Sequence, residues 1–165
     1  LYAMELEQEA KGTRKLLEQL PEDRMDWQPH AKSMTLGRLA SHIAEMPYWL
    51  TTTVETDELD FAKANYEAAN FSNKADLLAF FEEQVSGALR SLEGVSDETM
   101  MQVWMLKHND KVSFAMPKAA VIRSMVLSHL IHHRGQLSVY LRLLDAPVAG
   151  VYGPSADDRA AAQTD

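Results

Sequence analysis

The chain has 165 residues, of which 46% are hydrophobic, and its formal net charge at pH 7 is -8. This length suits one ordinary domain with a buried core. Because the Lys and Arg residues are scattered rather than clustered, the sequence argues against nucleic acid or an anionic membrane as a partner. The absence of cysteine excludes disulfides, thiolate metal ligands and cysteine nucleophiles, so any metal ion must be held by nitrogen and oxygen.

Neither a targeting segment nor a membrane span is predicted. Residues 1–7 are acidic and have a helical pattern, unlike a signal or transit peptide, although the missing initiator methionine leaves trimming open. No apolar run reaches the roughly 18 residues that a membrane helix needs. We therefore expect a cytoplasmic location.

Helical periodicity dominates the first 50 residues. A first helix of about five turns is predicted before Pro21, with apolar residues at helical spacing: Leu6, Ala10, Leu17 and Leu20. Residues 21–34 are predicted to be a loop anchored by Trp27. Thr35 suits the N-cap of a second helix, in which we expect Pro47 to cause a kink or an interruption.

The second half of the chain begins with a weak pattern. Residues 51–71 are expected to be irregular, and Ser72 or Asn73 to cap a third helix that ends near Gly94. After a short segment at 97–104 and a polar loop at 108–110, Pro117 suits the first turn of the longest helix, which is expected to run to about Leu144.

No segment alternates between apolar and polar residues for long enough to predict a sheet. Four amphipathic helices therefore predict an all-α fold, a single-domain antiparallel four-helix bundle comprising residues 1–150. Residues 151–165 are expected to form a C-terminal turn and an acidic, disordered tail.

Three of the six histidines lie within the longest predicted helix, at positions 129, 132 and 133. Because each helical residue rotates by about 100°, His129 and His133 project along nearly the same line, toward the apolar stripe of the helix. His132 lies about 80° from that line, at the edge of the stripe. The pair His129 and His133 is therefore the better candidate for binding a metal ion.

A purely structural explanation remains open at this point. A single histidine on an apolar face is usually a core residue whose ring nitrogens find hydrogen-bond partners. Two such histidines one turn apart each leave a ring nitrogen buried away from water without a hydrogen-bond partner, which costs a few kcal/mol of desolvation free energy. One shared cation provides a partner for both nitrogens. Imidazole is a common ligand of zinc, nickel, copper and iron.

A third ligand is expected from a facing helix, since two histidines leave a metal under-coordinated. His108 lies in a polar loop and is expected to be exposed, and His30 is expected to pack structurally beside Trp27. His42 flanks the stripe of the second helix and is the leading candidate. Glu45 could be a ligand, a general base or a hydrogen-bond acceptor, or it could lie on a solvated face.

Several segments together resemble the DinB family, in the right order and over nearly the whole chain. They are Asp26–His30, Thr35–Glu45, Met116–Val121, His129–Arg142, which contains the core HHRGQL, and Gly150–Asp158. The resemblance implies a four-helix bundle that binds a divalent metal through three histidines. The matching positions are His42, His129 and His133, and His132 is left out.

Three neutral imidazoles leave a coordination position open, as in catalytic metal sites. Zinc or nickel is the expected ion, with iron or manganese also admissible. Glu45, Gln136 and Tyr152 are candidates for orienting the histidine rings. The resemblance also implies a homodimer.

The function remains open among three hypotheses. The first is a small-molecule transferase or hydrolase, because relatives implied by the resemblance include metal-dependent thiol S-transferases and maleylpyruvate-isomerase-like proteins. The substrate could then include a low-molecular-weight thiol, and its pocket mouth is expected near residues 51–71 and His108. The second hypothesis is a metal-loaded binding protein of a stress response, without turnover. The third is a bundle whose histidines are only packed.

Overall fold

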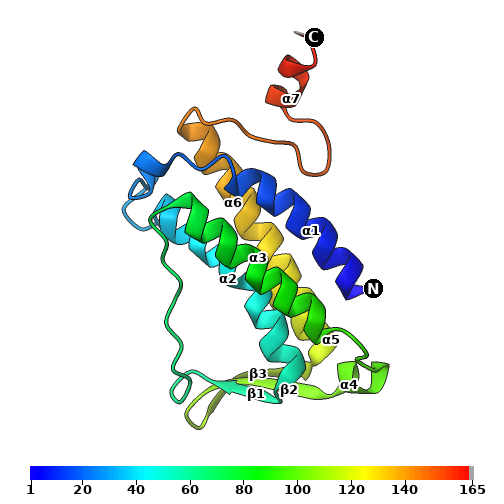
Figure 1. The fold of residues 1–165 in the computed structure, drawn as a ribbon. Helices are drawn as coiled ribbons and strands as arrows, with labels where there is room; N and C mark the ends of the chain where they lie inside the picture. The colour runs from blue at the N-terminus through cyan, green and yellow to red at the C-terminus, as the bar shows by residue number, and fades with distance from the viewer. Residues whose placement is uncertain (164–165) are drawn as a thin grey trace.

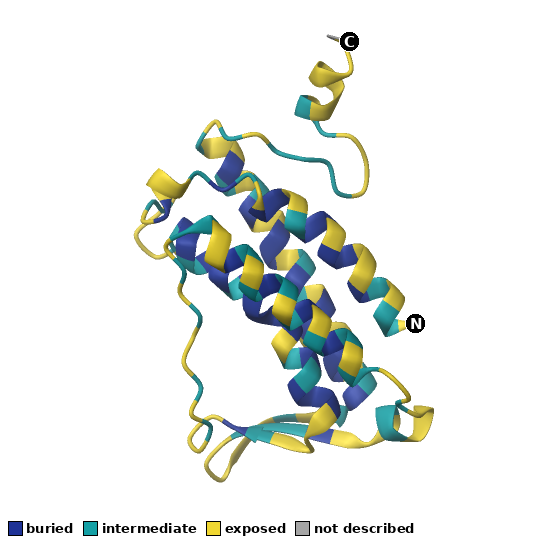
Figure 2. Cartoon of the chain, in the orientation of Figure 1, coloured by how far each residue is buried: buried dark blue, intermediate teal, exposed yellow. Residues whose placement is uncertain are grey.

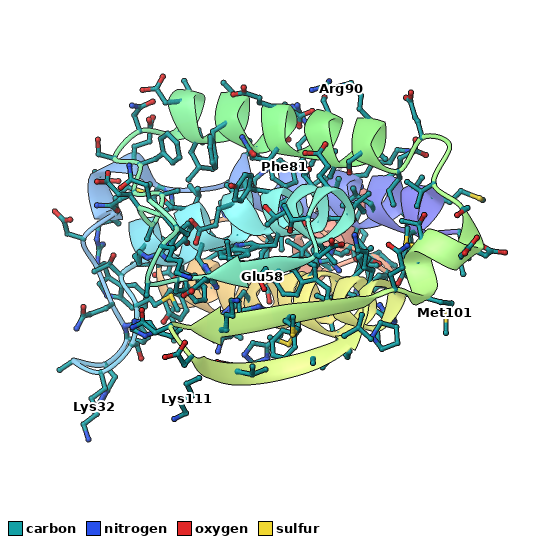
Figure 3. The ribbon with its side chains drawn as sticks, turned by 90° about the horizontal axis from the view of Figure 1, so that it is seen from below. Lys32, Glu58, Phe81, Arg90, Met101 and Lys111 are labelled. Atoms are coloured by element: carbon teal, nitrogen blue, oxygen red, sulfur yellow. The ribbon has the colours of Figure 1, made fainter. Side chains whose placement is uncertain are left out.

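The computed structural model describes residues 1–163, and four long helices form its body (Figure 1). They are α1 (Tyr2–Leu17), α2 (Leu36–Glu55), α3 (Lys74–Ser91) and α6 (Ser128–Leu143). Buried residues line their facing sides (Figure 2). Figure 3 shows this division on α3, where Phe81 lies on the bundle side and Arg90 points away.

The helix starts follow the predicted caps. The Thr35 side chain accepts a hydrogen bond from the Arg38 backbone N–H, and the Asn73 side chain accepts one from Asp76. Pro47 lies inside α2 without interrupting it. A short 3-10 turn, Glu22–Arg24, lies in the loop expected between α1 and α2.

The bundle is not wholly antiparallel, which corrects the prediction. The start of α2 at Gly37 lies beside Phe71, just before α3, and the end of α2 at Thr51 lies beside Gly87, so these two helices run parallel. The reason is that residues 61–73 return along the bundle before α3 begins (Figure 1). Thirteen extended residues reach about 40 Å, more than the roughly 30 Å length of a 20-residue helix.

A three-stranded sheet at one end of the bundle corrects the strictly all-α prediction (Figure 1). Its strands are β1 (Glu58–Asp60), β2 (Val103–His108) and β3 (Lys111–Pro117), in the order β1-β2-β3. β1 pairs with β2 in parallel, and β2 with β3 in antiparallel orientation. A short helix, α4 (Asp97–Met101), leads from the α3 end of the bundle into β2.

The longest predicted helix is built from three consecutive pieces. They are α5 (Lys118–Val121), a π-helical turn at Ile122–Leu127, and α6. Pro117 is the last residue of β3 and the N-cap of α5, one position before its predicted place. A π-helical turn is an uncommon feature that often occurs beside functional sites, and here it ends two residues before His129.

The C-terminal segment returns along α1 and includes a further short helix. α7 (Ala156–Ala161) begins with a capping box between Ser155 and Asp158, within the tail that was expected to be disordered. The last two residues of that tail, Thr164 and Asp165, lie outside the described residues. No helix within residues 1–163 has the length and apolar character needed to cross a membrane.

Candidate metal centre

Three histidines from two facing helices meet between α2 and α6. His42 lies in the second turn of α2, and His129 and His133 lie one turn apart on α6. One ring nitrogen of each lies within 4.8 Å of the others, and the Nε2 atoms of His129 and His133 are 2.8 Å apart. The structure thus brings together the three residues predicted as ligands. His132 is exposed and is not part of this group.

The Nδ1 atom of each ring already has a protein partner. His42 Nδ1 lies 2.6 Å from Glu45 Oε1, and His133 Nδ1 lies 2.7 Å from Gln136 Oε1. His129 Nδ1 lies 3.3 Å from the backbone carbonyl oxygen of Met125, in the π-helical turn. Glu45 and Gln136 are therefore placed where the sequence suggested a ring-orienting contact.

These partners determine which nitrogen of each ring is free. Carboxylate and carbonyl oxygens only accept hydrogen bonds, so each Nδ1 carries the hydrogen and donates it. With the hydrogens on Nδ1, the neutral rings present their Nε2 lone pairs, and the Nε2 atoms of His129 and His133 lie 2.8 Å apart. Such an arrangement is unfavourable in isolation and becomes favourable when a cation lies between the nitrogens.

The surroundings favour the uncharged form of the rings on α6. Burial, assisted by the neighbouring histidines, lowers the pKa of His133 to about 4, although its contact with Gln136 opposes this shift. Burial, and next the proximity of His42, also lowers the pKa of His129. Both rings are therefore neutral at pH 7, which is the form that binds metal ions.

Glu45 is held as a carboxylate by several donors. Burial alone raises its pKa, but hydrogen bonds with His42, the Ala69 backbone N–H and Arg38 outweigh that effect and lower it. The Ala69 N–H donates to Oε2 at 3.0 Å and Arg38 Nη2 donates to Oε1 at 3.1 Å. This negative charge next to His42 Nδ1 fixes the ring orientation and raises the basicity of its Nε2.

An apolar cavity of about 250 Å³ opens beside the histidines, between the bundle and the sheet. His42 and His129 form part of its wall. Aliphatic and aromatic side chains make up nearly all of the remaining wall, and the aromatic ones are Trp49, Phe61, Tyr66, Trp104 and Phe114. The predicted pocket mouth within residues 51–71 thus contributes Thr53, Phe61 and Tyr66, whereas His108 does not line the cavity.

The sequence matches the DinB family over residues 1–165. The chain belongs to the DinB family. The uncharacterized protein YrdA of Bacillus subtilis (strain 168) is 27% identical over 154 residues, which cover 91% of this chain and 85% of that protein.

Solved structures of other proteins share the fold. The DinB-like protein YjoA of Bacillus subtilis has a TM-score of 0.71 at 18% identity, covering 93% of this chain and 99% of that one. YfiT of Bacillus subtilis is described as a probable metal-dependent hydrolase with an unusual four-helix bundle topology. It has a TM-score of 0.62 at 12% identity, covering 87% of this chain and 86% of that one. A mycothiol-dependent maleylpyruvate isomerase has a TM-score of 0.55 at 12% identity, covering 90% of this chain and 61% of that one. At these identities the likeness shows the DinB-like fold alone.

Other polar candidates within this DinB chain lie away from the histidines. The Tyr152 hydroxyl donates to Glu9 Oε2 at 2.8 Å and accepts from Arg134 Nη2 at 2.6 Å, so its hydrogen bonds are with α1 and α6 rather than with the rings. His30 is exposed rather than packed, and His108 is exposed as expected. Sequence reasoning missed Arg38 and the Met125 carbonyl, since neither a surface arginine nor a backbone atom gives a pattern signal.

Proposed function

We propose that His42, His129 and His133 bind one divalent metal ion and that the protein is a metal-dependent small-molecule transferase or hydrolase. The observation that carries this proposal is the convergence of three imidazoles whose Nδ1 atoms are all engaged elsewhere. Each ring then has one lone pair to offer, and the three together supply a complete set of nitrogen ligands.

The spacing of the nitrogens suits a small cation. Nitrogen ligands about 2.0–2.1 Å from a tetrahedral ion lie about 3.3 Å from one another. This value falls between the 2.8 Å contact of His129 with His133 and the 4.8 Å limit for the whole group. Three imidazoles favour zinc or nickel, and iron or manganese are also compatible with them.

An ion held by three protein ligands keeps an open coordination position. Held by His42, His129 and His133, a divalent ion would supply Lewis-acid chemistry, which polarises a carbonyl oxygen or favours the ionised form of water or of a thiol. The residues of the chain hold and orient the rings: Glu45 and Gln136 accept from Nδ1 of His42 and His133. The side chains around the face of the site that His42 and His129 share are mostly apolar.

Two structural neighbours support this choice of reaction class. YfiT is described as a probable metal-dependent hydrolase, and the maleylpyruvate isomerase is described as mycothiol-dependent, which indicates a low-molecular-weight thiol as one reactant to test. Neither likeness identifies a substrate, so water and thiols are both candidates as the nucleophile.

Two measurements test the proposal. Protein purified without a histidine tag should contain about one metal ion per chain, and a stoichiometry far below one would overturn the metal site. The metal-loaded protein should then be assayed with low-molecular-weight thiols and electrophilic acceptors, and with simple esters. Turnover that disappears on chelation supports the enzyme. Full metal loading without turnover on either substrate panel would favour a metal-loaded binding protein.

A further inference from the structure

The cavity beside the histidines has an unusually uniform chemical character. Its described lining includes no Asp, Glu, Lys or Arg side chain. The polar groups that it does contain are mostly engaged: Thr53 Oγ1 donates to the Trp49 carbonyl oxygen, and Trp104 Nε1 donates to Thr56 Oγ1. Trp49 Nε1 is buried without a hydrogen-bond partner, so this indole N–H and the imidazoles of His42 and His129 are the polar groups available at this wall.

The walls are aromatic on two sides. The rings of Trp49, Phe61 and Tyr66 contact one another, with centroid separations of 5.1 to 5.9 Å. On the sheet side, Trp104 and Phe114 come from the paired strands β2 and β3, with ring centroids 6.1 Å apart. Flat aromatic walls favour stacking or edge contacts with another ring.

The tyrosine in this wall adds no charge. Burial first, and then the Glu45 carboxylate, raises the pKa of Tyr66 to about 12, so its hydroxyl stays protonated at any physiological pH. An ionic group seated between the aromatic walls, away from the histidine cluster, would therefore lose its hydration without gaining a counter-charge, which is costly.

The volume sets the size of the ligand. An engineered apolar cavity of about 150 Å³ in another protein binds benzene. The cavity here, of about 250 Å³, has room for a substituted aromatic ring or a fused pair of rings.

We propose that this cavity binds the uncharged, ring-containing part of the substrate, with one polar substituent directed to the histidine cluster. The inference rests on the proposed function, since it assigns a substrate class to the same site: neutral aromatic molecules with a single reactive group, rather than sugars, nucleotides or amino acids.

The test uses 2-naphthylmethanol as the probe and full-length protein freed of metal. Binding is measured by calorimetry and by the NMR signals of the indole N–H groups. The signals of Trp49 and Trp104 should shift, whereas that of Trp27, which packs on Tyr140 outside the cavity, should not. A shift confined to Trp27 would overturn the proposal.

A charged analogue of the same shape makes the test selective. The protein carries a net charge of -8, so nonspecific attraction favours the cation (2-naphthylmethyl)ammonium. The proposal expects the opposite order, with the neutral alcohol binding at least tenfold more tightly. Equal or tighter binding of the cation would contradict the uncharged cavity.

Two neighbouring residues on β2 provide a matched pair of variants. Leu106 lines the cavity and Met105 does not. Leu106→Trp should weaken binding of the alcohol at least tenfold by filling the cavity, and Met105→Trp should change it less than twofold. Equal effects of the two substitutions would argue against this location. Should Leu106→Trp fail to fold, the indole shifts of the wild type still decide the site.

One further variant separates this inference from the proposed function. His133 belongs to the histidine cluster but does not line the cavity. His133→Ala should lose the metal ion and keep its affinity for the alcohol within about threefold. Binding of the alcohol without any turnover would leave the cavity assignment standing while the enzyme proposal fails. Turnover without binding of the alcohol would support the enzyme proposal and overturn the cavity assignment.

Discussion

Glu9 Oε2 lies 2.6 Å from Arg134 Nη2, and both side chains are buried between α1 and α6. Arg134 also donates through Nη1 to the Glu9 carbonyl oxygen at 3.0 Å, and Tyr152 closes the network from the C-terminal segment. Arg134 directly follows His133, so this ion pair fixes the helix that carries two of the three proposed ligands.

Replacing Arg134 by Met should strongly destabilise the protein. The substitution leaves the Glu9 carboxylate buried without its partner, and breaking a buried ion pair on one side costs about 3–5 kcal/mol. Arg142→Met, on the same helix, removes an exposed pair with Asp157 and should cause a much smaller loss. Urea unfolding followed by circular dichroism measures both. Similar losses for the two variants would show that the buried network adds little.

The helix-face assignment of the histidines predicts a contrast between neighbours. His129→Ala should abolish stoichiometric metal binding, because it removes one of the three proposed ligands. His132→Ala should leave the metal content unchanged, since His132 is exposed and lies outside the cluster. Metal analysis of tag-free protein by mass spectrometry checks both variants. Loss of metal in His132→Ala would refute the proposed ligand set.

The Glu45 carboxylate should strengthen metal binding without touching the ion. Glu45→Gln keeps the shape but removes the negative charge that His42 Nδ1 faces at 2.6 Å. Loss of such a ring-orienting partner typically lowers metal affinity about 10–100-fold. Competition with a chromophoric chelator measures the change. Glu55→Gln, at the exposed end of the same helix, is the control and should retain the wild-type affinity.

The helices and the histidine faces could be predicted because they depend on local periodicity and caps. The 3.6-residue repeat places His129 and His133 on one line, and Thr35 and Asn73 begin their helices as expected. The choice of His42 as third ligand could not come from spacing, because it depends on how α2 packs against α6. The family resemblance supplied that long-range information.

The sheet was missed although part of its signal is present. In β3, Val112, Phe114 and Met116 alternate with less apolar residues, and Asn109 adopts a positive φ in the hairpin turn before it. In β2 the cavity-facing residues Trp104 and Leu106 are apolar, but so are Val103 and Met105 between them, so the strand shows no alternation between apolar and polar residues. β1 has three residues and is defined by pairing with β2, far along the chain, so no local pattern marks it.

The parallel direction of α2 and α3 could not be predicted from sequence periodicity either. A periodic pattern identifies a helix face but not the direction in which the helix crosses its neighbour. The deciding feature is the irregular return segment at 61–73, which places the start of α3 beside the start of α2. That segment also carries Phe61 and Tyr66, so the same topology that makes two helices parallel builds one wall of the cavity.

The buried histidines should make the stability of the metal-free protein depend on pH. The pKa of His133 is about 4 in the folded chain and that of His129 is also lowered, whereas an unfolded histidine titrates near 6.5. Below about pH 6.5 the unfolded state therefore binds more protons than the folded state does. The stabilising contribution of the two neutral histidines is lost progressively as the pH falls toward about 4.

Chelator-treated protein should accordingly show a falling free energy of unfolding from pH 7 to pH 5 in urea titrations. Carboxylates with lowered pKa, such as Glu45, add to the loss only at lower pH, near and below about 4.5. The double variant His129→Gln, His133→Gln removes both titrating rings and should flatten the dependence between pH 7 and pH 5. An equally steep dependence in that variant would assign the effect to groups other than these two histidines.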